Sequence, residues 1–354
     1  MNPRTENRQL KSPRLKSPRP ETQPPPRLAI SMGDPGGIGP EVVLKAIATW
    51  TRSPAMEPLL VGDRAVWEET ARRLGLGLRF SDTKRRGAIT VAITSELEAR
   101  HRVPGPARNA ASAAARGEAA YRAILEGVRL VQAGQATALV TAPINKAHLN
   151  AAGHDFPGHT ELLAKLCGDV PVRMMMVGAE LRVVLVTTHV AIAQVPKRLN
   201  REGVLQTIVL TGQALRRQFG ITAPQLAVCG LNPHAGDSGL FGDEEARVIA
   251  PAVRAACRRG LHVLGPLAAD GVFAHAANDG FYDAVVCMYH DQGLAPFKFV
   301  HFADGVNFTV GLPFVRTSPD HGTAFDVAGS GQADPRSMAA ALRLAAQLAG
   351  NVTG

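Results

Sequence analysis

Short apolar runs alternate with longer amphipathic segments through most of this chain. The apolar runs are typical of buried strands, and they lie at residues 28–31, 59–62, 89–93, 138–140, 225–229, 261–264 and 283–288. Segments with one apolar face predict helices, and they lie at residues 40–50, 109–133, 153–165, 201–219, 244–258 and 336–349. This alternation predicts an α/β fold with a largely parallel sheet.

One stretch interrupts the alternation. Apolar runs at residues 172–177 and 181–187 flank a turn at residues 178–180, and this arrangement predicts a β-hairpin. The hairpin arm is a candidate dimerisation element.

The stretch with the most candidate chemistry runs from residue 281 to residue 329. The predicted strand at 283–288 delivers His290 and Asp291 to its C-terminal end, where α/β folds place their chemistry, and Gly293 is expected to break the strand. Three anion-binding side chains follow at even intervals, namely Lys298, Asn307 and Arg316. We interpret the stretch as the floor of an active site that holds a phosphorylated acid.

Composition separates the N-terminal residues from the rest of the chain. Residues 1–26 are rich in Pro, Arg, Lys and Ser and contain LKSPR twice, so they are predicted to be a disordered basic tail. Residues 1–27 contribute +5 to the net charge of +9. The mildly basic remainder suits an enzyme with anionic substrates. Aromatic residues make up only 5% of the chain, which argues against stacking platforms for nucleic acid.

Cysteine usage and hydropathy predict a cytoplasmic protein. The four cysteines lie far apart without a CxxC pair, which is typical of buried free thiols in a reducing compartment. Every apolar run is too short to cross a bilayer, and the N-terminal residues contain no apolar stretch of the kind that a secretory signal requires.

Three loops carry polar or glycine-rich patterns that allow two interpretations each. Residues 33–41 join a strand to a helix as GDPGGIGPE, either as a structural turn or as a ligand loop, and they match neither GxGxxG nor a Walker loop. Lys146 follows a strand and is expected either to bind substrate or to cap a helix. His159 and Thr160 open a helix, where they either cap it or bind an anion.

Three histidines follow apolar strands, namely His189, His234 and His290. Because the C-terminal ends of parallel strands meet at one sheet edge, we expect the three side chains to converge there. Three neutral imidazoles suit Zn²⁺, Co²⁺ or Ni²⁺ better than Mg²⁺, and an open coordination position would remain for a substrate oxygen. The spacing is not HExxH, so a metalloprotease is not indicated.

The sequence resembles the 4-hydroxythreonine-4-phosphate dehydrogenase family of pyridoxal phosphate biosynthesis. The blocks that carry this resemblance are GDPGGIGPE (33–41), GHTE (158–161), TTH (187–189), CGLNPHAGD (229–237), MYHDQG (288–293) and GVNFTVGLPFVRTSPDHGTAFDVAG (305–329). They follow the order of the family and cover nearly the whole chain after the tail.

The resemblance implies an isocitrate/isopropylmalate dehydrogenase-like fold in which residues 27–354 form one catalytic unit of two interleaved α/β subdomains. It implies an active site in the cleft, a homodimer with a shared site, and metal ligands His189, His234 and His290, with His189 supplied by the other subunit. The implied substrate contacts are His159, Thr160, Lys298, Asn307 and Arg316. The implied cofactor contacts are Gly33, Asp34, His321, Gly322, Thr323 and Asp326.

The implied reaction is an NAD- or NADP-dependent oxidation of the C3 hydroxyl of 4-phosphooxythreonine with decarboxylation, assisted by one divalent ion (Zn²⁺, Co²⁺ or Mg²⁺). Asp270, Asp291 and Lys298 are the candidate catalytic residues, although a carboxylate that orients a histidine ligand is an equal alternative for either aspartate. A paralogue that oxidises 4-phosphothreonate or 4-phosphoerythronate is the alternative within the family. Rival classes are a nucleic-acid-associated protein with a basic tail, and a phosphate acyltransferase.

Overall fold

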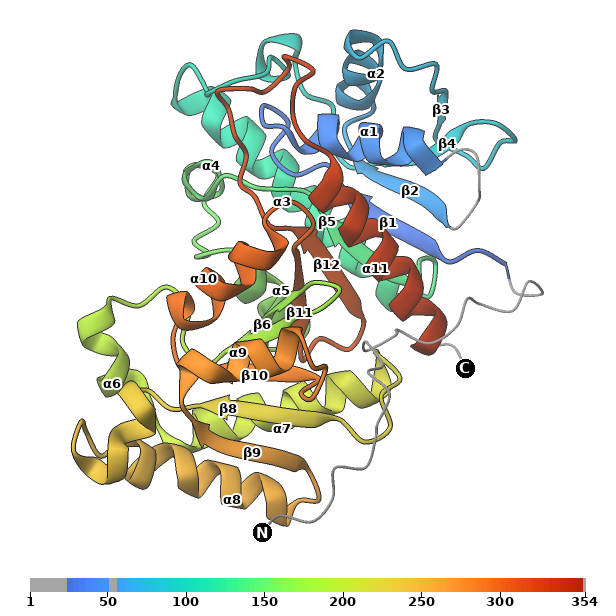
Figure 1. The fold of residues 1–354 in the computed structure, drawn as a ribbon. Coiled ribbons are helices and arrows are strands. Elements are labelled where there is room, and N and C mark those ends of the chain that lie inside the picture. The colour runs from blue at the N-terminus through green and yellow to red at the C-terminus, as the bar shows by residue number, and fades with distance from the viewer. Residues whose placement is uncertain (1–23, 51–55, 353–354) are drawn as a thin grey trace. The chain divides into compact units, whose positions relative to one another are not determined.

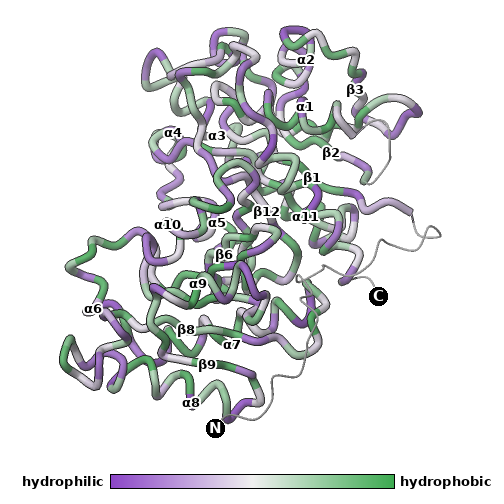
Figure 2. The backbone as a smooth tube through the Cα atoms, in the orientation of Figure 1, coloured by the Kyte–Doolittle hydropathy of each residue, from purple (hydrophilic) through white to green (hydrophobic). Residues whose placement is uncertain are grey.

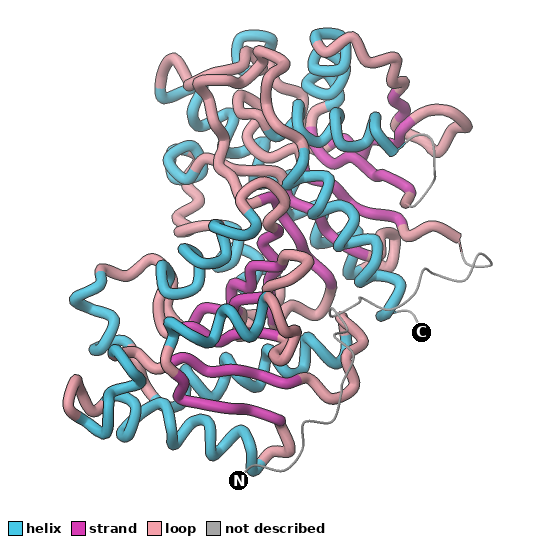
Figure 3. The backbone as a smooth tube through the Cα atoms, viewed as in Figure 1, coloured by secondary structure: helices cyan, strands magenta, loops and turns pink. Residues whose placement is uncertain are grey.

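A computed structural model of the protein describes residues 24–50 and 56–352. The predicted disordered tail, residues 1–26, therefore lies almost entirely outside the described residues. The described chain forms two compact units. The continuous unit consists of residues 173–302, and the split unit consists of residues 24–172 and 303–352. In both units, strands are flanked by helices (Figures 1 and 3).

The strands of the split unit follow the order β3-β4-β2-β1-β5-β12-β11. They are β1 (Arg27–Ser31), β2 (Glu57–Gly62), β3 (Phe80–Ser81), β4 (Ile89–Ile93), β5 (Ala138–Thr141), β11 (Val306–Val310) and β12 (Val315–Pro319). All neighbouring pairs in this order are parallel except the last pair, β11 and β12, which is antiparallel. Strands β1 and β5 are almost completely buried, as expected for parallel strands covered on both faces.

Three of the helices in the split unit, α2, α3 and α4, begin at capping side chains. The helices of this unit are α1 (Gly39–Trp50), α2 (Arg64–Arg73), α3 (Ala110–Gln132), α4 (Lys146–Ala151), α5 (His159–Leu166) and α11 (Arg336–Val352), with a 3₁₀ turn η1 (Ala99–His101). Asp63, Asn109 and Asn145 each accept a hydrogen bond from the backbone N–H three residues later, the usual cap of an α-helix. Helix α3 packs on β1, β2 and β5, and α11 packs on β5, β11 and β12 (Figure 1).

The strands of the continuous unit follow the order β6-β7-β10-β8-β9. They are β6 (Arg173–Val177), β7 (Arg182–Leu185), β8 (Gln225–Cys229), β9 (His262–Leu267) and β10 (Ala284–Cys287). The predicted hairpin is confirmed, because β6 and β7 pair antiparallel. Strand β7 also pairs in parallel with β10, so the hairpin is part of this unit's sheet. Its role in dimerisation stays a prediction.

The helices of the continuous unit include three that sequence patterns did not predict, α6, α9 and α10. The helices are α6 (Val195–Arg198), α7 (Arg201–Arg217), α8 (Ala250–Arg258), α9 (Ala269–Ala277) and α10 (His290–His301), with the shorter turns η2 (Ile192–Gln194), η3 (Pro233–Gly239) and η4 (Glu245–Ile249). In Figure 2, α8 alternates between hydrophilic and hydrophobic colour, as an amphipathic helix should.

The expectation that Gly293 breaks a strand is wrong. Strand β10 ends at Cys287, and Gly293 lies inside α10. A Cβ on Gly293 would lie 3.0 Å from Cys287 Sγ and 3.1 Å from a methyl carbon of Leu185. Gly293 therefore lets α10 pack closely against the ends of two strands.

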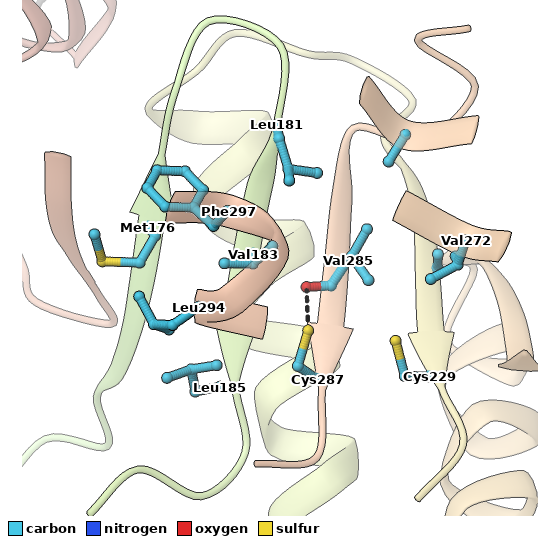
Figure 4. Packing of buried hydrophobic residues seen from close by; sticks show 12 residues of the cluster. Met176, Leu181, Val183, Leu185, Cys229, Val272, Val285, Cys287, Leu294 and Phe297 are labelled. Carbon is cyan, nitrogen blue, oxygen red and sulfur yellow. Dashed lines mark hydrogen bonds between the residues drawn. The ribbon is translucent and has the colours of Figure 1, made fainter. Parts of the chain in front are cut away.

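The core of the continuous unit forms between its sheet and the helices α9 and α10. Figure 4 shows Leu294 and Phe297 of α10 beside Met176 and Val183. Cys229 and Cys287 belong to this cluster and are buried free thiols, whereas Cys167 is only partly buried and Cys257 is exposed. The expectation of buried thiols is therefore confirmed for two of the four cysteines. No helix among the described residues is long and apolar enough to cross a membrane.

Candidate functional site

The three candidate metal-binding histidines follow three neighbouring strands of the continuous unit. Strand β10 lies between β7 and β8 and pairs in parallel with both, so the three C-terminal ends lie side by side. His189 follows β7, His234 follows β8, and His290 is the first residue of α10, directly after β10. The C-terminal ends of the three strands therefore lie at one edge of the sheet, and convergence of all three histidine side chains stays a prediction.

His189 and His290 lie close together within a single chain. Their ring centroids are 5.8 Å apart, and both residues line a cavity of about 320 Å³ together with Thr188, Tyr289 and Asp291. The Nδ1 atom of His290 lies 2.6 Å from Oδ1 of Asp291. A carboxylate at Nδ1 leaves Nε2 of His290 available as a ligand atom.

His234 lies in a loop with an unusual backbone. Residues 234–238 all have positive φ angles, and His234 itself has φ 51° and ψ 29°. Residues other than glycine rarely adopt this left-handed conformation, which costs roughly 1–2 kcal/mol per residue. The surrounding structure must therefore hold the loop, and strain of this kind is found at functional sites.

Glu245 is the side chain that holds this loop. It is buried, and its Oε1 accepts hydrogen bonds from the backbone N–H groups of Leu231 (2.7 Å) and Asn232 (2.8 Å). Its Oε2 accepts a further bond from the Asn232 side-chain amide. Burial alone would raise the pKa of Glu245, but the hydrogen bonds from Asn232 and Leu231 outweigh it, so the pKa is lowered.

The described residues contain no group of three His, Cys, Asp or Glu side chains close enough to hold a metal ion. Metal binding by His189, His234 and His290 therefore stays a prediction. The donor set fits a borderline divalent ion, because two imidazoles share one cavity and the third lies on the loop after the neighbouring strand. The prediction that a partner subunit supplies His189 also stays untested.

Arg316 is the centre of the candidate anion site in the split unit. It is 1% exposed, and its guanidinium donates hydrogen bonds to Oγ1 of Thr141 (2.6 and 3.1 Å) and of Thr309 (2.9 Å). Burial lowers the pKa of Arg316 to about 9, so it carries its charge at neutral pH. Three of its five N–H donors are engaged in these bonds, which leaves two for an anion.

His159, Thr160 and Asn307 belong to the same unit as Arg316. The pKa of His159 is lowered well below its usual value by burial and by the charge of Arg316, so its imidazole is neutral at pH 7. Nε2 of His159 and Oδ1 of Asn307 are buried without a hydrogen-bond partner. Such orphaned polar atoms are costly, and they mark positions where a ligand can bond.

Lys146, whose role the sequence left open, opens α4, but the cap of that helix is Asn145. The remaining candidates from the sequence, Lys298 and Asp270, lie in the continuous unit. Lys298 is a partly buried residue of α10. Asp270 is an exposed residue in the first turn of α9, where its Oδ1 accepts the N–H of Gly271 at 3.0 Å.

The glycine loop at residues 33–39 is tightly packed in the split unit. Gly33 has φ 69°, and a Cβ there would lie 2.3 Å from the carbonyl oxygen of Pro143, so only glycine fits. Asp34 is fully buried, and its two carboxylate oxygens are engaged by the Gly36 N–H (2.9 Å) and by Nδ1 of His148 (2.6 Å). Its carboxylate thus shapes the loop and ties it to α4.

The segment that carries His321, Gly322, Thr323 and Asp326 lies against the glycine loop. The Ile38 N–H donates to the Thr323 carbonyl oxygen at 2.9 Å, and a Cβ on Gly37 would lie 3.0 Å from Cβ of Thr323. Gly322 and Asp326 are exposed. The structure therefore joins the two segments in which the sequence placed the cofactor contacts, although contact with a cofactor itself stays a prediction.

Sequence reasoning missed the residues that support these loops. Glu245 and Gln292 hold strand ends in the continuous unit, and Arg116 donates to the backbone carbonyls of residues 101, 103 and 105 beneath the glycine loop. The one signal in the sequence that could have indicated these supporting residues is a polar residue within an apolar helical pattern. The partner atoms are backbone groups far away in sequence, so no motif could identify them.

Comparisons with known proteins agree on one family. A family model described as "Pyridoxal phosphate biosynthetic protein PdxA" matches residues 54–345. The chain is 49% identical over 332 residues to the 4-hydroxythreonine-4-phosphate dehydrogenase of Geobacter metallireducens, with 92% of this chain and 96% of that protein covered. It is 41% identical to the D-threonate 4-phosphate dehydrogenase of Pectobacterium atrosepticum, with 91% and 99% covered. A crystal structure of 4-hydroxythreonine-4-phosphate dehydrogenase from Klebsiella pneumoniae has a TM-score of 0.81 and 40% identity, with 93% and 99% covered.

Proposed function

We propose that this chain, which belongs to the pyridoxal phosphate biosynthetic protein PdxA family, oxidises the C3 hydroxyl of 4-phosphooxythreonine with NAD⁺ and releases CO₂. The product would be 3-amino-2-oxopropyl phosphate. The main support is the 49% identity over nearly the whole length of a relative named for this dehydrogenase activity. The placement of three histidines at one sheet edge provides independent support.

His189, His234 and His290 are the residues that would hold a divalent ion. Such an ion supplies Lewis-acid stabilisation of negative charge on a substrate oxygen during oxidation and decarboxylation. Asp291 orients His290 through the 2.6 Å contact at Nδ1. This contact favours an orienting role for Asp291, and it leaves Asp270 and Lys298 as the candidates for transfer of the hydroxyl proton.

The anion site in the split unit would hold the charged groups of the substrate. Arg316 offers two unused N–H donors in a buried setting, where a charge-assisted bond to phosphate or carboxylate is strong. Neutral His159 can donate or accept a single hydrogen bond at Nε2, depending on its tautomer. Thr160 adds a hydroxyl group and Asn307 an amide. Lys298 belongs to the continuous unit, where it stays a predicted substrate contact.

The cofactor would lie along the glycine loop and the segment at residues 321–326. Closely packed glycines let the backbone approach a phosphate, and the contact of Gly37 with Thr323 joins the two segments. The proposed position is the same for NAD and NADP, and it does not depend on a GxGxxG motif.

A paralogous activity is the second candidate, in which 4-phosphothreonate replaces the amino acid. It is favoured by the 41% identity to a relative named D-threonate 4-phosphate dehydrogenase. The two substrates share the phosphate, the carboxylate and the C3 hydroxyl, and they differ in an amine against a hydroxyl group. The residues discussed above serve either one.

The test is an assay of NADH formation with purified protein, NAD⁺ and Zn²⁺, Co²⁺ or Mg²⁺. We expect reduction with 4-phosphooxythreonine, and the ratio of kcat/KM for the two substrates identifies the physiological one. Absence of NADH from NAD⁺, and of NADPH from NADP⁺, with both substrates and all three ions would refute the proposed dehydrogenase activity.

A further inference from the structure

Gln292 connects the ends of two strands in the continuous unit. It lies in the first turns of α10 and is 8% exposed. Its Oε1 accepts the backbone N–H of Met288 at 2.7 Å, and its Nε2 donates to the carbonyl oxygen of Gly230 at 2.7 Å. Met288 directly follows β10 and Gly230 directly follows β8. A single amide therefore joins the two strand exits, that is, the residues at which the chain leaves each strand.

The hydrogen-bond chain continues to the third strand. Thr187, two residues after β7, donates from Oγ1 to the carbonyl oxygen of Met288 at 2.7 Å, and its backbone N–H donates to the same oxygen at 3.2 Å. The peptide groups of Met288 are therefore held from both sides, by Thr187 and by Gln292. The chain runs across all three strand exits in the order β7, β10, β8.

Each anchor of this chain stands just before one of the candidate metal ligands. Thr187 precedes His189, Met288 precedes His290, and Gly230 opens the loop that carries His234. Where the regular sheet hydrogen bonds end, buried backbone groups need other partners. Both ends of the Gln292 amide serve this purpose, and they set the spacing between the exits.

We propose that Gln292 is a positioning residue that fixes the relative positions of the strand ends from which the three candidate metal-binding histidines emerge. It touches neither the ion nor the substrate in this role. Removing its amide would leave a buried N–H on Met288 and a buried carbonyl on Gly230 without partners, and the exits of β8 and β10 would shift to regain water or other bonds. This inference rests on the metal site of the proposed function.

The test is Gln292→Met, which preserves length and burial but has no amide. We expect the Kd for Zn²⁺, measured by competition with a chromophoric chelator, to rise about 10- to 100-fold, the usual effect of losing a group that orients metal ligands. In metal-free protein, hydrogen exchange should become faster at the amide of Met288. Gln292→Glu keeps an acceptor for Met288 but loses the donor to Gly230, so it tests the second bond separately.

Thr211→Val is the matched control. Thr211 is buried in α7 of the same unit, and its Oγ1 donates to the Thr207 carbonyl oxygen at 2.7 Å. This variant loses a buried side-chain hydrogen bond of similar length at a place unconnected to the strand exits. Its Zn²⁺ affinity should match that of the unaltered protein.

A double-mutant cycle separates positioning from a general loss of stability. In a His234→Ala background, Gln292→Met should weaken Zn²⁺ binding less than it does in the unaltered protein, because the ligand it positions is gone. Equal weakening in both backgrounds, or an unchanged Kd in Gln292→Met, would overturn the inference. If Gln292→Met does not fold, Thr187→Val removes the hydroxyl bond at the other side of Met288, and an unchanged Kd there would be equally decisive.

The inference and the proposed function fail in different ways. Failure of the unaltered protein to bind Zn²⁺, Co²⁺ or Mg²⁺ would refute the metal site itself. Normal binding by the unaltered protein together with normal binding by the Gln292 variants would refute only the positioning role.

Discussion

Buried ionisable side chains in this protein mostly support loops. Arg116 donates three hydrogen bonds to backbone carbonyls, Glu245 accepts three from one loop, and Arg316 bonds two threonines. Burying a charge is costly unless hydrogen bonds compensate. Arg116 and Glu245 bond backbone groups of the loops they support, whereas Arg316 bonds threonine hydroxyl groups and lies close enough to His159 to lower its pKa. This difference favours a ligand-binding role for Arg316.

Arg316→Lys should reduce kcat/KM by at least about 100-fold, since lysine keeps the charge but cannot bond Thr141, Thr309 and an anion together. Steady-state NADH kinetics measures this effect. Arg129→Lys is the control, because Arg129 lies at the exposed end of α3 and pairs only with Glu126. Comparable kcat/KM values in the two variants would show that Arg316 is not part of the anion site.

Glu245→Gln should lower the free energy of unfolding by about 1–3 kcal/mol at pH 7, because one buried acceptor becomes a donor facing Asn232. The folded pKa lies below the ordinary value of 4.5, so this stabilisation is present above that value and is lost as the pH falls through the folded pKa. Denaturant unfolding of both proteins from pH 7 to pH 3 should therefore show the difference shrinking. A difference independent of pH would contradict the carboxylate's role.

Helix α10 concentrates function in one element of twelve residues. It starts with His290, carries Gln292 and Lys298, and reaches the strand ends through Gly293. Gly293 and Pro296 both disfavour helix by intrinsic propensity, so the sequence suggested a strand end followed by a loop. Tertiary packing of Leu294 and Phe297 on the sheet outweighs that local preference.

The contact between α3 and α4 provides a test at the scale of elements. A Cβ on Gly117 of α3 would lie 1.9 Å from the carbonyl oxygen of His148 in α4. Gly117→Ala should therefore push α4 away and destabilise the protein by about 1–3 kcal/mol. It should also raise the KM for NAD⁺, because His148 bonds Asp34 of the glycine loop.

Gly350→Ala in α11 is the matched control, because a Cβ at that position would meet no described atom within 4 Å outside its neighbours and the backbone of its own helix. Alanine should leave stability unchanged or increase it slightly there, by its helix propensity. Thermal unfolding and the KM for NAD⁺ are the measurements. Equal behaviour of the two variants would show that α4 does not depend on the close approach at Gly117.

At the scale of the whole molecule, the α/β class with mostly parallel strands is confirmed. Most strands predicted from apolar runs are present, and their boundaries differ by only a few residues from the expected ones. The proposed metal ligands all lie in the continuous unit, while most proposed substrate and cofactor contacts lie in the split unit.

Mixing two inactive variants tests the proposed homodimer with a shared site. If His189 is supplied by a partner subunit, His189→Ala and His234→Ala proteins should regain part of the dehydrogenase activity when they are mixed and allowed to exchange subunits. If His189 acts with His290 of its own chain, as their 5.8 Å ring separation allows, the mixture stays inactive. The control is each variant mixed with itself.

Removal of residues 1–23 should leave kcat/KM unchanged within about twofold, because a charged extension of this composition buries no core. The deletion stops before Pro26, whose carbonyl oxygen accepts the Glu57 N–H. The same NADH assay measures the effect, and the full-length protein is the reference. A large loss would show that the basic residues take part in substrate binding.

The sequence alone determined the class of fold, the strands that end in histidines, and the family. These features depend on local patterns, because the spacing of apolar residues within a segment predicts whether it forms a strand or an amphipathic helix. It also indicated that polar groups at strand ends would meet, since parallel strands share one edge.

Only the tertiary structure decided which side chains hold those ends in place. Gln292 bonds Gly230, Glu245 bonds Leu231, and His148 bonds Asp34, and all three pairs are distant in sequence. The sequence blocks that contain Asp34, Gly230 and Leu231 do not indicate which side chain bonds each of them, so the partner is defined only when the chain is folded. The candidate ligands could be predicted from the sequence because residue type alone indicates which side chains can bind a metal or an anion. The side chains that hold the ligand-bearing loops in place could not, because their role depends on the spatial arrangement of the chain.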